Sequence, residues 1–67
     1  MTYSVRAVDA GGWRVEIVDA AGRPVFERSC SGAAEAEGFR STVEQHLGWL
    51  SEEKFRRYYR LPDPDEG

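Results

Sequence analysis

The chain has 67 residues, of which 40% are hydrophobic and 31% charged, and its formal net charge is −3. A chain of this length forms at most one small domain, which buries about 60% of the surface that its unfolded form exposes. No apolar stretch approaches the roughly 20 residues of a membrane-spanning helix, so the composition excludes a membrane protein and a multidomain enzyme. The first residues lack the basic start and apolar segment of a secretion signal, and we therefore expect a cytoplasmic protein.

The first half of the chain has the two-residue period of β-strands. Apolar and polar residues alternate over 3–7 and again over 13–19, and a third apolar segment occupies about 24–30. The intervening segments 8–12 and 18–22 both read Val-Asp-Ala and end in glycine, a pattern that favours a type I turn followed by a glycine bulge. This order predicts a three-stranded antiparallel meander with residues 13–19 in the centre.

The third predicted strand contains two adjacent apolar residues, Val25 and Phe26. Because neighbouring side chains of a strand point to opposite faces, one of the two must face outward. We expect Phe26 and Cys30 to face the core. Pro24 cannot donate a ladder hydrogen bond and is typical of an edge strand or of the first residue of a strand.

The second half changes to the period of an α-helix and predicts two helices. An apolar stripe about 80° wide predicts the first helix over residues 33–47. Gly48 suits a left-handed position just after this helix, which would allow Trp49 to fold back onto Val43. Ser51 is then the N-cap of a second helix over residues 52–60.

These patterns predict an α+β fold in the order β-β-β-α-α. The meander is followed by a helix that packs on one face and by a short second helix that folds back against that layer or its edge. We expect the domain to span residues 1–60 and an acidic, flexible tail to span 61–67. The predicted core consists of Val5, Ala7, Val15, Ile17, Phe26, Ala36, Phe39, Val43, Leu47, Leu50 and Phe55.

The sequence contains few candidate catalytic residues. Cys30 is the only thiol and His46 the only histidine, so a Cys–His nucleophilic pair is conceivable. No third polar residue at suggestive spacing orients such a pair, and we interpret Cys30 as a small buried residue and His46 as a half-buried one. One histidine and scattered carboxylates do not form a metal-ligand pattern. The sequence therefore predicts no enzyme activity, no cofactor and no metal.

The segment of residues 54–60 combines cations with aromatic side chains, and it is the candidate interaction surface. Residues 51–60 carry a charge of +2 inside an acidic protein. Two interpretations remain open. The segment is either a cationic face that binds phosphate groups or an acidic partner, or an ordinary amphipathic helix that docks by its aromatic residues. We favour the second interpretation, because Glu52 and Glu53 can pair with two of the arginines. The candidate surface consists of Trp49, Lys54, Arg56, Arg57, Tyr58, Tyr59 and Arg60.

The predicted sheet suggests a function class. A three-stranded sheet has two open edges and one uncovered face, and both can pair with another protein or a second copy. We therefore expect a small non-catalytic protein-binding or assembly module whose partner is an unknown protein or the same chain in a homodimer. The alternative is a nucleic-acid-associated protein that uses the basic helix 52–60, which a pI near 5.0 disfavours. No membrane partner is expected.

The order of three short strands and a helix that begins near Ala34-Glu35-Ala36-Glu37 resembles two groups of small domains. Residues 13–43 are similar to the arm-type DNA-binding module at the N-terminus of phage-type integrases. Residues 22–43, with a Gly-containing hairpin and an Ala/Glu-rich helix, resemble the uncharacterised YegP-like domain. Each resemblance covers about half of the chain and implies a β-β-β-α layout; the first also implies a sheet that enters the major groove.

Overall fold

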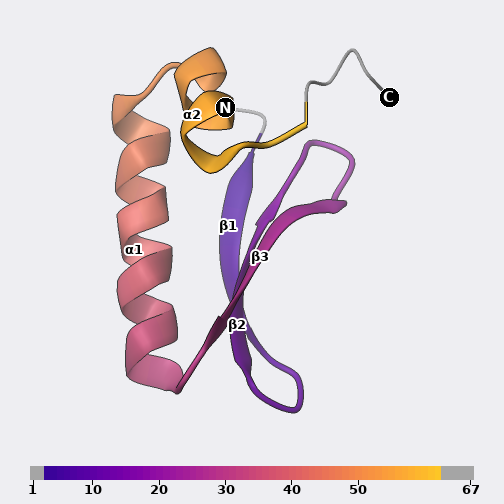
Figure 1. Cartoon of the computed structure of the whole chain (residues 1–67), viewed down its shortest axis with the longest axis vertical. Helices are drawn as coiled ribbons and strands as arrows, with labels where there is room; N and C mark the ends of the chain where they lie inside the picture. The colour runs from indigo at the N-terminus through magenta and orange to yellow at the C-terminus, as the bar shows by residue number, and fades with distance from the viewer. Residues whose placement is uncertain (1–2, 63–67) are drawn as a thin grey trace.

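The computed structural model describes residues 3–62 and contains a three-stranded antiparallel sheet and two helices (Figure 1). The sheet order is β1-β2-β3, and α1 lies along the sheet while α2 sits at one end, between α1 and the strands. The predicted α+β fold is thereby confirmed. The elements are β1 (Ser4–Asp9), β2 (Trp13–Val18), β3 (Pro24–Cys30), α1 (Ala33–Trp49) and α2 (Glu52–Tyr59).

The register of the sheet aligns the apolar positions of all three strands on one face. Ile17 of β2 pairs with Val5 of β1 and with Phe26 of β3. A bulge follows, because Val18 pairs with Pro24 and leaves Val25 as an extra residue in β3. Val25 and Phe26 both pack against the core, so the expectation that one of them faces outward was wrong.

The turn between β2 and β3 shows why the Asp…Gly segments form connections. The carboxylate of Asp19 accepts hydrogen bonds from the backbone N–H groups of Ala21 at 3.0 Å and Arg23 at 2.9 Å. Gly22 has a φ of 82°, in the left-handed region that favours glycine. The sequence predicted both features.

The core lies between the sheet and the two helices. Val15, Ile17, Val43 and Phe55 are its largest fully buried side chains, and all four belong to the predicted core. Four further hydrophobic residues are buried although the sequence analysis did not predict it: Tyr3, Val18, Tyr59 and Leu61. Leu61 lies in the core, one residue beyond the domain boundary predicted at residue 60. Pro62, the next residue of the predicted tail, is exposed, and the remaining tail residues, 63–67, lie outside the described residues.

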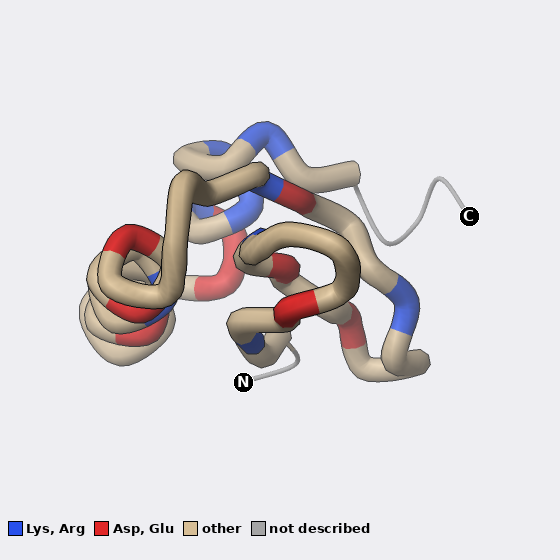
Figure 2. Tube along the Cα trace, turned by 90° about the horizontal axis from the view of Figure 1, so that it is seen from below, with Lys and Arg blue, Asp and Glu red and all other residues tan. Residues whose placement is uncertain are grey.

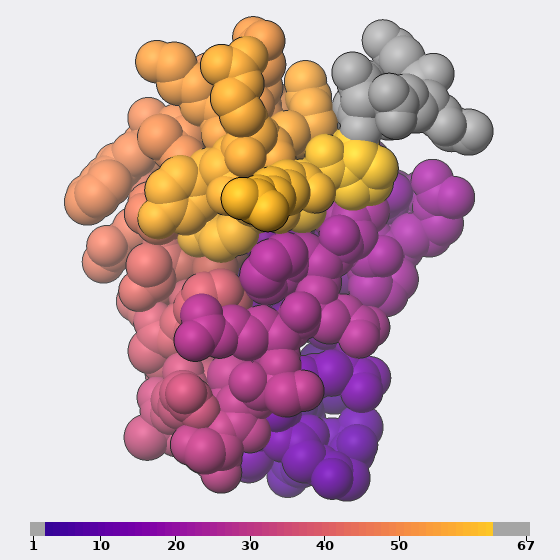
Figure 3. Space-filling view, viewed as in Figure 1, coloured from indigo at the N-terminus to yellow at the C-terminus, as the bar shows by residue number. Residues whose placement is uncertain are grey.

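Helix α2 is an integral part of this core. The rings of Phe55 and Tyr3 lie 5.6 Å apart, and those of Tyr59 and Phe26 also lie 5.6 Å apart in an edge-on arrangement. After α2, Arg60 adopts a left-handed conformation with a φ of 55°, which turns the chain so that the N–H of Leu61 donates to the carbonyl of Arg56 at 2.8 Å. The space-filling view shows residues 50–62, in orange and yellow, as a continuous surface over this end of the molecule (Figure 3).

The connection between the helices differs in detail from the prediction. The two helices are separate, as expected, but α1 continues to Trp49, and Gly48 lies inside it instead of taking a left-handed position after it. Trp49 therefore does not fold back onto Val43, and its side chain is 76% exposed. The chain leaves the helix at Leu50, whose extended backbone suffices to redirect it, so the break does not need the special conformation of glycine.

Candidate interaction surface

The turn from α1 to α2 is fixed by local hydrogen bonds and by burial. The N–H of Leu50 donates to the carbonyl of His46 at 2.9 Å, and the hydroxyl of Ser51 accepts a bond from the N–H of Lys54 at 3.3 Å. Leu50 packs against the core cluster that contains Phe55, on the other side of the cap. The predicted N-cap Ser51, together with Leu50 and Phe55 of the predicted core, thus holds the two helices in a defined orientation.

An aromatic cluster lies on this turn. The ring of His46 is 4.8 Å from the ring of Tyr58 and 6.5 Å from that of Trp49. Trp49 is 76% exposed and Tyr58 63%, and they are the two exposed large hydrophobic residues of the described chain. Below them, Nδ1 of His46 and the hydroxyl of Tyr59 share a hydrogen bond of 2.6 Å. This bond ties the exposed rings to the buried side of α2.

Tyr59 supports the aromatic cluster from the core side and is too buried to contact a partner protein itself. Only 9% of its surface is exposed, so its place in the candidate surface is beneath the aromatic cluster. Burial raises the pKa of its hydroxyl, and the neighbouring Tyr58 acts in the same direction. The hydroxyl therefore stays protonated at neutral pH.

A hollow of about 230 Å³ opens beside the exposed ring of Tyr58, and we call it the junction hollow. Leu50 and Tyr58 supply apolar walls, and the long side chains of Lys54 and Arg57, which end in cations, complete a lining that is almost entirely apolar. We use the term junction surface for these four residues together with Trp49. Apolar walls next to fixed charges are typical of surfaces that hold a side chain of another protein.

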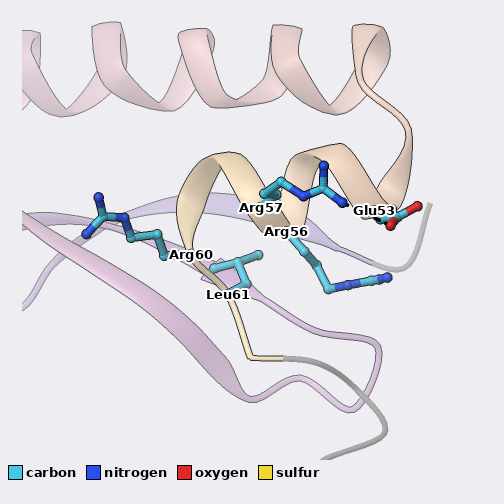
Figure 4. A pocket seen from close by; sticks show the side chains of 5 residues that line it. All are labelled: Glu53, Arg56, Arg57, Arg60 and Leu61. Carbon is cyan, nitrogen blue, oxygen red and sulfur yellow. Dashed lines mark hydrogen bonds and ion pairs between the residues drawn. The ribbon is translucent and has the colours of Figure 1, made fainter.

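A second hollow, of about 440 Å³, lies on another side of α2, and we call it the arginine hollow. Its lining consists of Glu53, Arg56, Arg57, Arg60 and Leu61. Arg56 pairs with Glu52 and Arg57 with Glu53, each at 3.1 Å, as the four-residue spacing predicted. Figure 4 shows that Arg60 extends away from the other two arginines. The three guanidinium groups therefore do not converge on one point, as a phosphate would require.

The structure therefore separates the predicted surface residues into three groups. Trp49, Lys54, Arg57 and Tyr58 gather at the junction surface, Arg56 and Arg60 line the arginine hollow, and Tyr59 is buried. Sequence reasoning did not include Leu50 and His46 in the site. The three-residue spacing of His46 and Trp49 on one helix face was the signal that could have added the histidine.

Charge is distributed unevenly over the two helices. Acidic residues predominate along α1, whereas basic residues predominate on α2 (Figure 2). Arg40, in the middle of α1, bridges Glu37 and Glu44 at 2.5 Å each. The only net cationic helix in the described part of the chain is thus the one that carries the junction surface.

The sheet contains a buried carboxylate that the sequence analysis did not single out. Glu16 is 3% exposed and lies at the centre of the face that points away from α1. Arg6 donates to one of its carboxylate oxygens at 2.8 Å and Arg14 to the other at 2.9 Å. The hydrogen bond from Arg6, assisted by Arg14, holds the pKa of Glu16 below its usual value against the opposing effect of burial. Both arginines are therefore engaged in ion pairs within the sheet.

The two residues of the conceivable nucleophilic pair lie far apart. Cys30 ends β3, just before α1, and its Sγ lies 3.8 Å from the carbonyl of Arg28. His46 lies in the last turns of α1, which is roughly 20 Å along the helix axis from its start. Within residues 3–62, no group of His, Cys, Asp and Glu side chains has a geometry that could hold a metal ion. Nor does this part of the chain contain a helix long and apolar enough to cross a membrane.

Comparison with known proteins returns no match among protein-family models, curated proteins or solved structures. The resemblance to the integrase arm-type module and to the YegP-like domain therefore stays a prediction.

Proposed function

We propose that the protein is a small, non-catalytic, cytoplasmic protein-binding module that contacts its partner through the junction surface. The observation that carries this proposal is the pair of exposed aromatic side chains, Trp49 and Tyr58, both near the ring of His46, of which Tyr58 also lines an apolar hollow. Large aromatic residues and arginine are the residue types that dominate the energetics of protein interfaces. Exposed apolar side chains that gather at one place are typical of interaction sites, whereas single scattered ones are not.

The rigidity of the surface supports the same proposal. Trp49 and Tyr58 stand on helices and not on loops, and His46 lies between their rings. The bond from His46 to the buried Tyr59 fixes this arrangement to the core. A surface that is ordered before binding loses less conformational entropy when a partner docks.

The experiment compares the proteins that co-purify with the wild type and with matched variants. The tagged full chain, expressed in its source cells, is cross-linked and purified as wild type and as a Trp49→Ser/Tyr58→Ser double variant. An Ala10→Ser/Ala34→Ser double variant serves as the control, because both alanines are exposed and lie at the end of the molecule opposite α2. We expect a stoichiometric protein that the wild type and the control recover and the aromatic variant loses. Equal recovery by all three would refute a role for the junction surface.

Self-association, in which the partner is a second copy of the chain, is the other form of the proposed protein-binding function. The edges of β1 and β3 are each paired on one side only, so a second copy could extend the sheet. Light scattering over a range of concentrations distinguishes this case, because a homodimer doubles the mass of the 7.6 kDa chain. A dimer that persists in the Trp49→Ser/Tyr58→Ser variant would show that assembly does not depend on the junction surface.

Nucleic-acid binding through residues 52–60 is the second candidate, and the net positive charge of this segment is the observation in its favour. The ion pairs of Arg56 and Arg57 with neighbouring glutamates reduce the charge available to phosphates. A labelled duplex titrated at 50 mM salt tests this candidate, because phosphate contacts weaken steeply as salt rises. Salt-sensitive binding that is lost in Arg60→Gln would support it, and no binding at 50 mM salt would dismiss it.

A further inference from the structure

The junction hollow combines apolar walls with a cation that has no counter-charge in the described structure. Among residues 3–62, the ammonium group of Lys54 forms no ion pair. Arg57, which also lines the hollow, pairs with Glu53, but both side chains are about three-quarters exposed, at 76% and 74%. An ion pair that is so exposed contributes little and exchanges readily with another carboxylate. The two basic side chains that line the hollow therefore carry their charges to its surroundings, where an incoming acidic group can meet them.

The size of the junction hollow restricts what it can hold. Its volume of about 230 Å³ lies below the roughly 300–1,000 Å³ of pockets that enclose cofactors and drug-sized ligands. A side chain of a docked protein segment needs less room, and Leu50 and Tyr58 give it an apolar environment. Trp49 does not line the hollow, but its ring lies 6.5 Å from that of His46, which is 4.8 Å from the ring of Tyr58, and three-quarters of its surface is exposed.

We propose that the junction surface binds an acidic segment of a partner protein, with one apolar side chain of that segment in the junction hollow and carboxylates against Lys54 and Arg57. This inference rests on the proposed function and specifies the chemistry of the partner. It follows from charge complementarity: the surface supplies cations and apolar walls, and the complementary segment supplies carboxylates and an apolar side chain.

Other occupants complement the surface less well. A nucleic acid would gain from the cations but would leave the apolar wall of Leu50 without a partner. In a symmetric dimer through this surface, Lys54 of one copy would face the cations of the other, because a twofold interface brings the same patch together. The acidic residues 63–67 of the chain itself read Asp-Pro-Asp-Glu-Gly and contain no large apolar side chain for the hollow.

The test is a titration of the full ¹⁵N-labelled chain with synthetic peptides, followed by NMR. The first probe is a twelve-residue peptide in which a Leu-Phe pair is flanked by Asp and Glu, and the second has Lys in place of each acidic residue. We expect the acidic peptide to shift the indole signal of Trp49 and the amide signals of residues 50–58, and to bind at least about tenfold more tightly than the Lys peptide.

Two variants with the same net charge isolate the role of Lys54. Lys54→Gln and Ala34→Glu each lower the net charge by one. Ala34, however, lies in the first turn of α1, whereas Trp49 of the junction surface lies at the other end of that helix. We expect Lys54→Gln to weaken binding of the acidic peptide roughly three- to tenfold and Ala34→Glu to change it less than twofold. Equal loss in both variants would mean that only the overall charge matters and would overturn the inference.

The remaining outcomes separate this inference from the proposed function. Equal binding of both peptides, shifts confined to the arginine hollow, concentration-dependent shifts without peptide, or no binding at millimolar peptide would each refute an acidic segment as the occupant. Recovery of a partner that depends on Trp49 and Tyr58 would still support the proposed function in all of these cases. Loss of that dependence would remove the proposed function itself.

Discussion

Replacing Phe55 tests whether α2 is part of the domain or an appendage to it. Phe55 is fully buried and lies in contact with Tyr3 and Tyr59, at ring separations of 5.6 Å and 4.9 Å. Truncation of a buried phenylalanine to alanine costs about 3–5 kcal/mol. A single core in a chain of this size supplies roughly 3–5 kcal/mol in total. We therefore expect Phe55→Ala to unfold most of the molecules at 25 °C, including the sheet.

A milder substitution at the same position keeps the measurement quantitative. Phe55→Leu removes three side-chain carbons, which corresponds to a loss of about 2 kcal/mol. For a domain of this length, the midpoint of thermal unfolding then falls by roughly 8–16 °C. Tyr58→Ala is the matched control on the same helix, because its side chain is 63% exposed and should change the free energy of unfolding by less than about 0.5 kcal/mol.

Circular dichroism during thermal and urea unfolding measures all three variants. The reasoning is wrong if Phe55→Ala keeps a cooperative transition within about 5 °C of the wild type, because α2 would then contribute little to the core. A loss of helical signal without a loss of the sheet would likewise show that α2 detaches on its own. A large effect of Tyr58→Ala would mean that the exposed ring supports the fold in addition to the junction surface.

Three further predictions concern stability. Tyr59→Phe removes the hydroxyl that bonds to His46 and should cost about 0.5–1.5 kcal/mol in urea unfolding; no change would mean that the bond does not form in solution. The lowered pKa of Glu16 means that its contribution is fully present above the ordinary glutamate pKa of about 4.3 and is lost as pH falls through the folded value. Glu16→Gln should therefore flatten the fall in stability below that pH, and an unchanged pH profile would contradict this. Gly38→Ala, with no atom within 4 Å of the added carbon in α1, should stabilise by about 0.5–1 kcal/mol, whereas Gly22→Ala, at a φ of 82°, should destabilise; equal effects in thermal unfolding would refute the assignment of their backbones.

Local features of the fold could be predicted because they depend on neighbours in the sequence. The alternation of side chains located the strands, and the Asp…Gly segment ending at Gly22 located the connection between β2 and β3, since both depend on residues a few positions apart. Ser51 likewise identified the start of α2, because an N-cap bonds to a residue only three positions away. The two predicted helices are separate, although Gly48 proved not to be the reason for the break between them.

Burial at the ends of the chain could not be predicted in the same way. Tyr3 and Leu61 are 58 positions apart, and both are buried in the core cluster to which α2 contributes Phe55 and Tyr59. A pattern of period two or 3.6 describes one element and does not say where a second element will lie. The extra residue Val25 shows the same limit, since the bulge that turns it towards the core depends on the register between two strands.

The candidate surface also combines features that the sequence predicted with features that only the tertiary structure shows. The residue types of the segment 54–60 marked it as cationic and aromatic, and the four-residue spacing marked the ion pairs of α2. Only the packed structure decides that Tyr59 is buried while Tyr58 and Trp49 stay exposed, and that Leu50 joins them in one hollow. The physical reason is that secondary structure and capping depend on interactions within one turn of the chain, whereas the exposure of a side chain depends on which distant elements cover it.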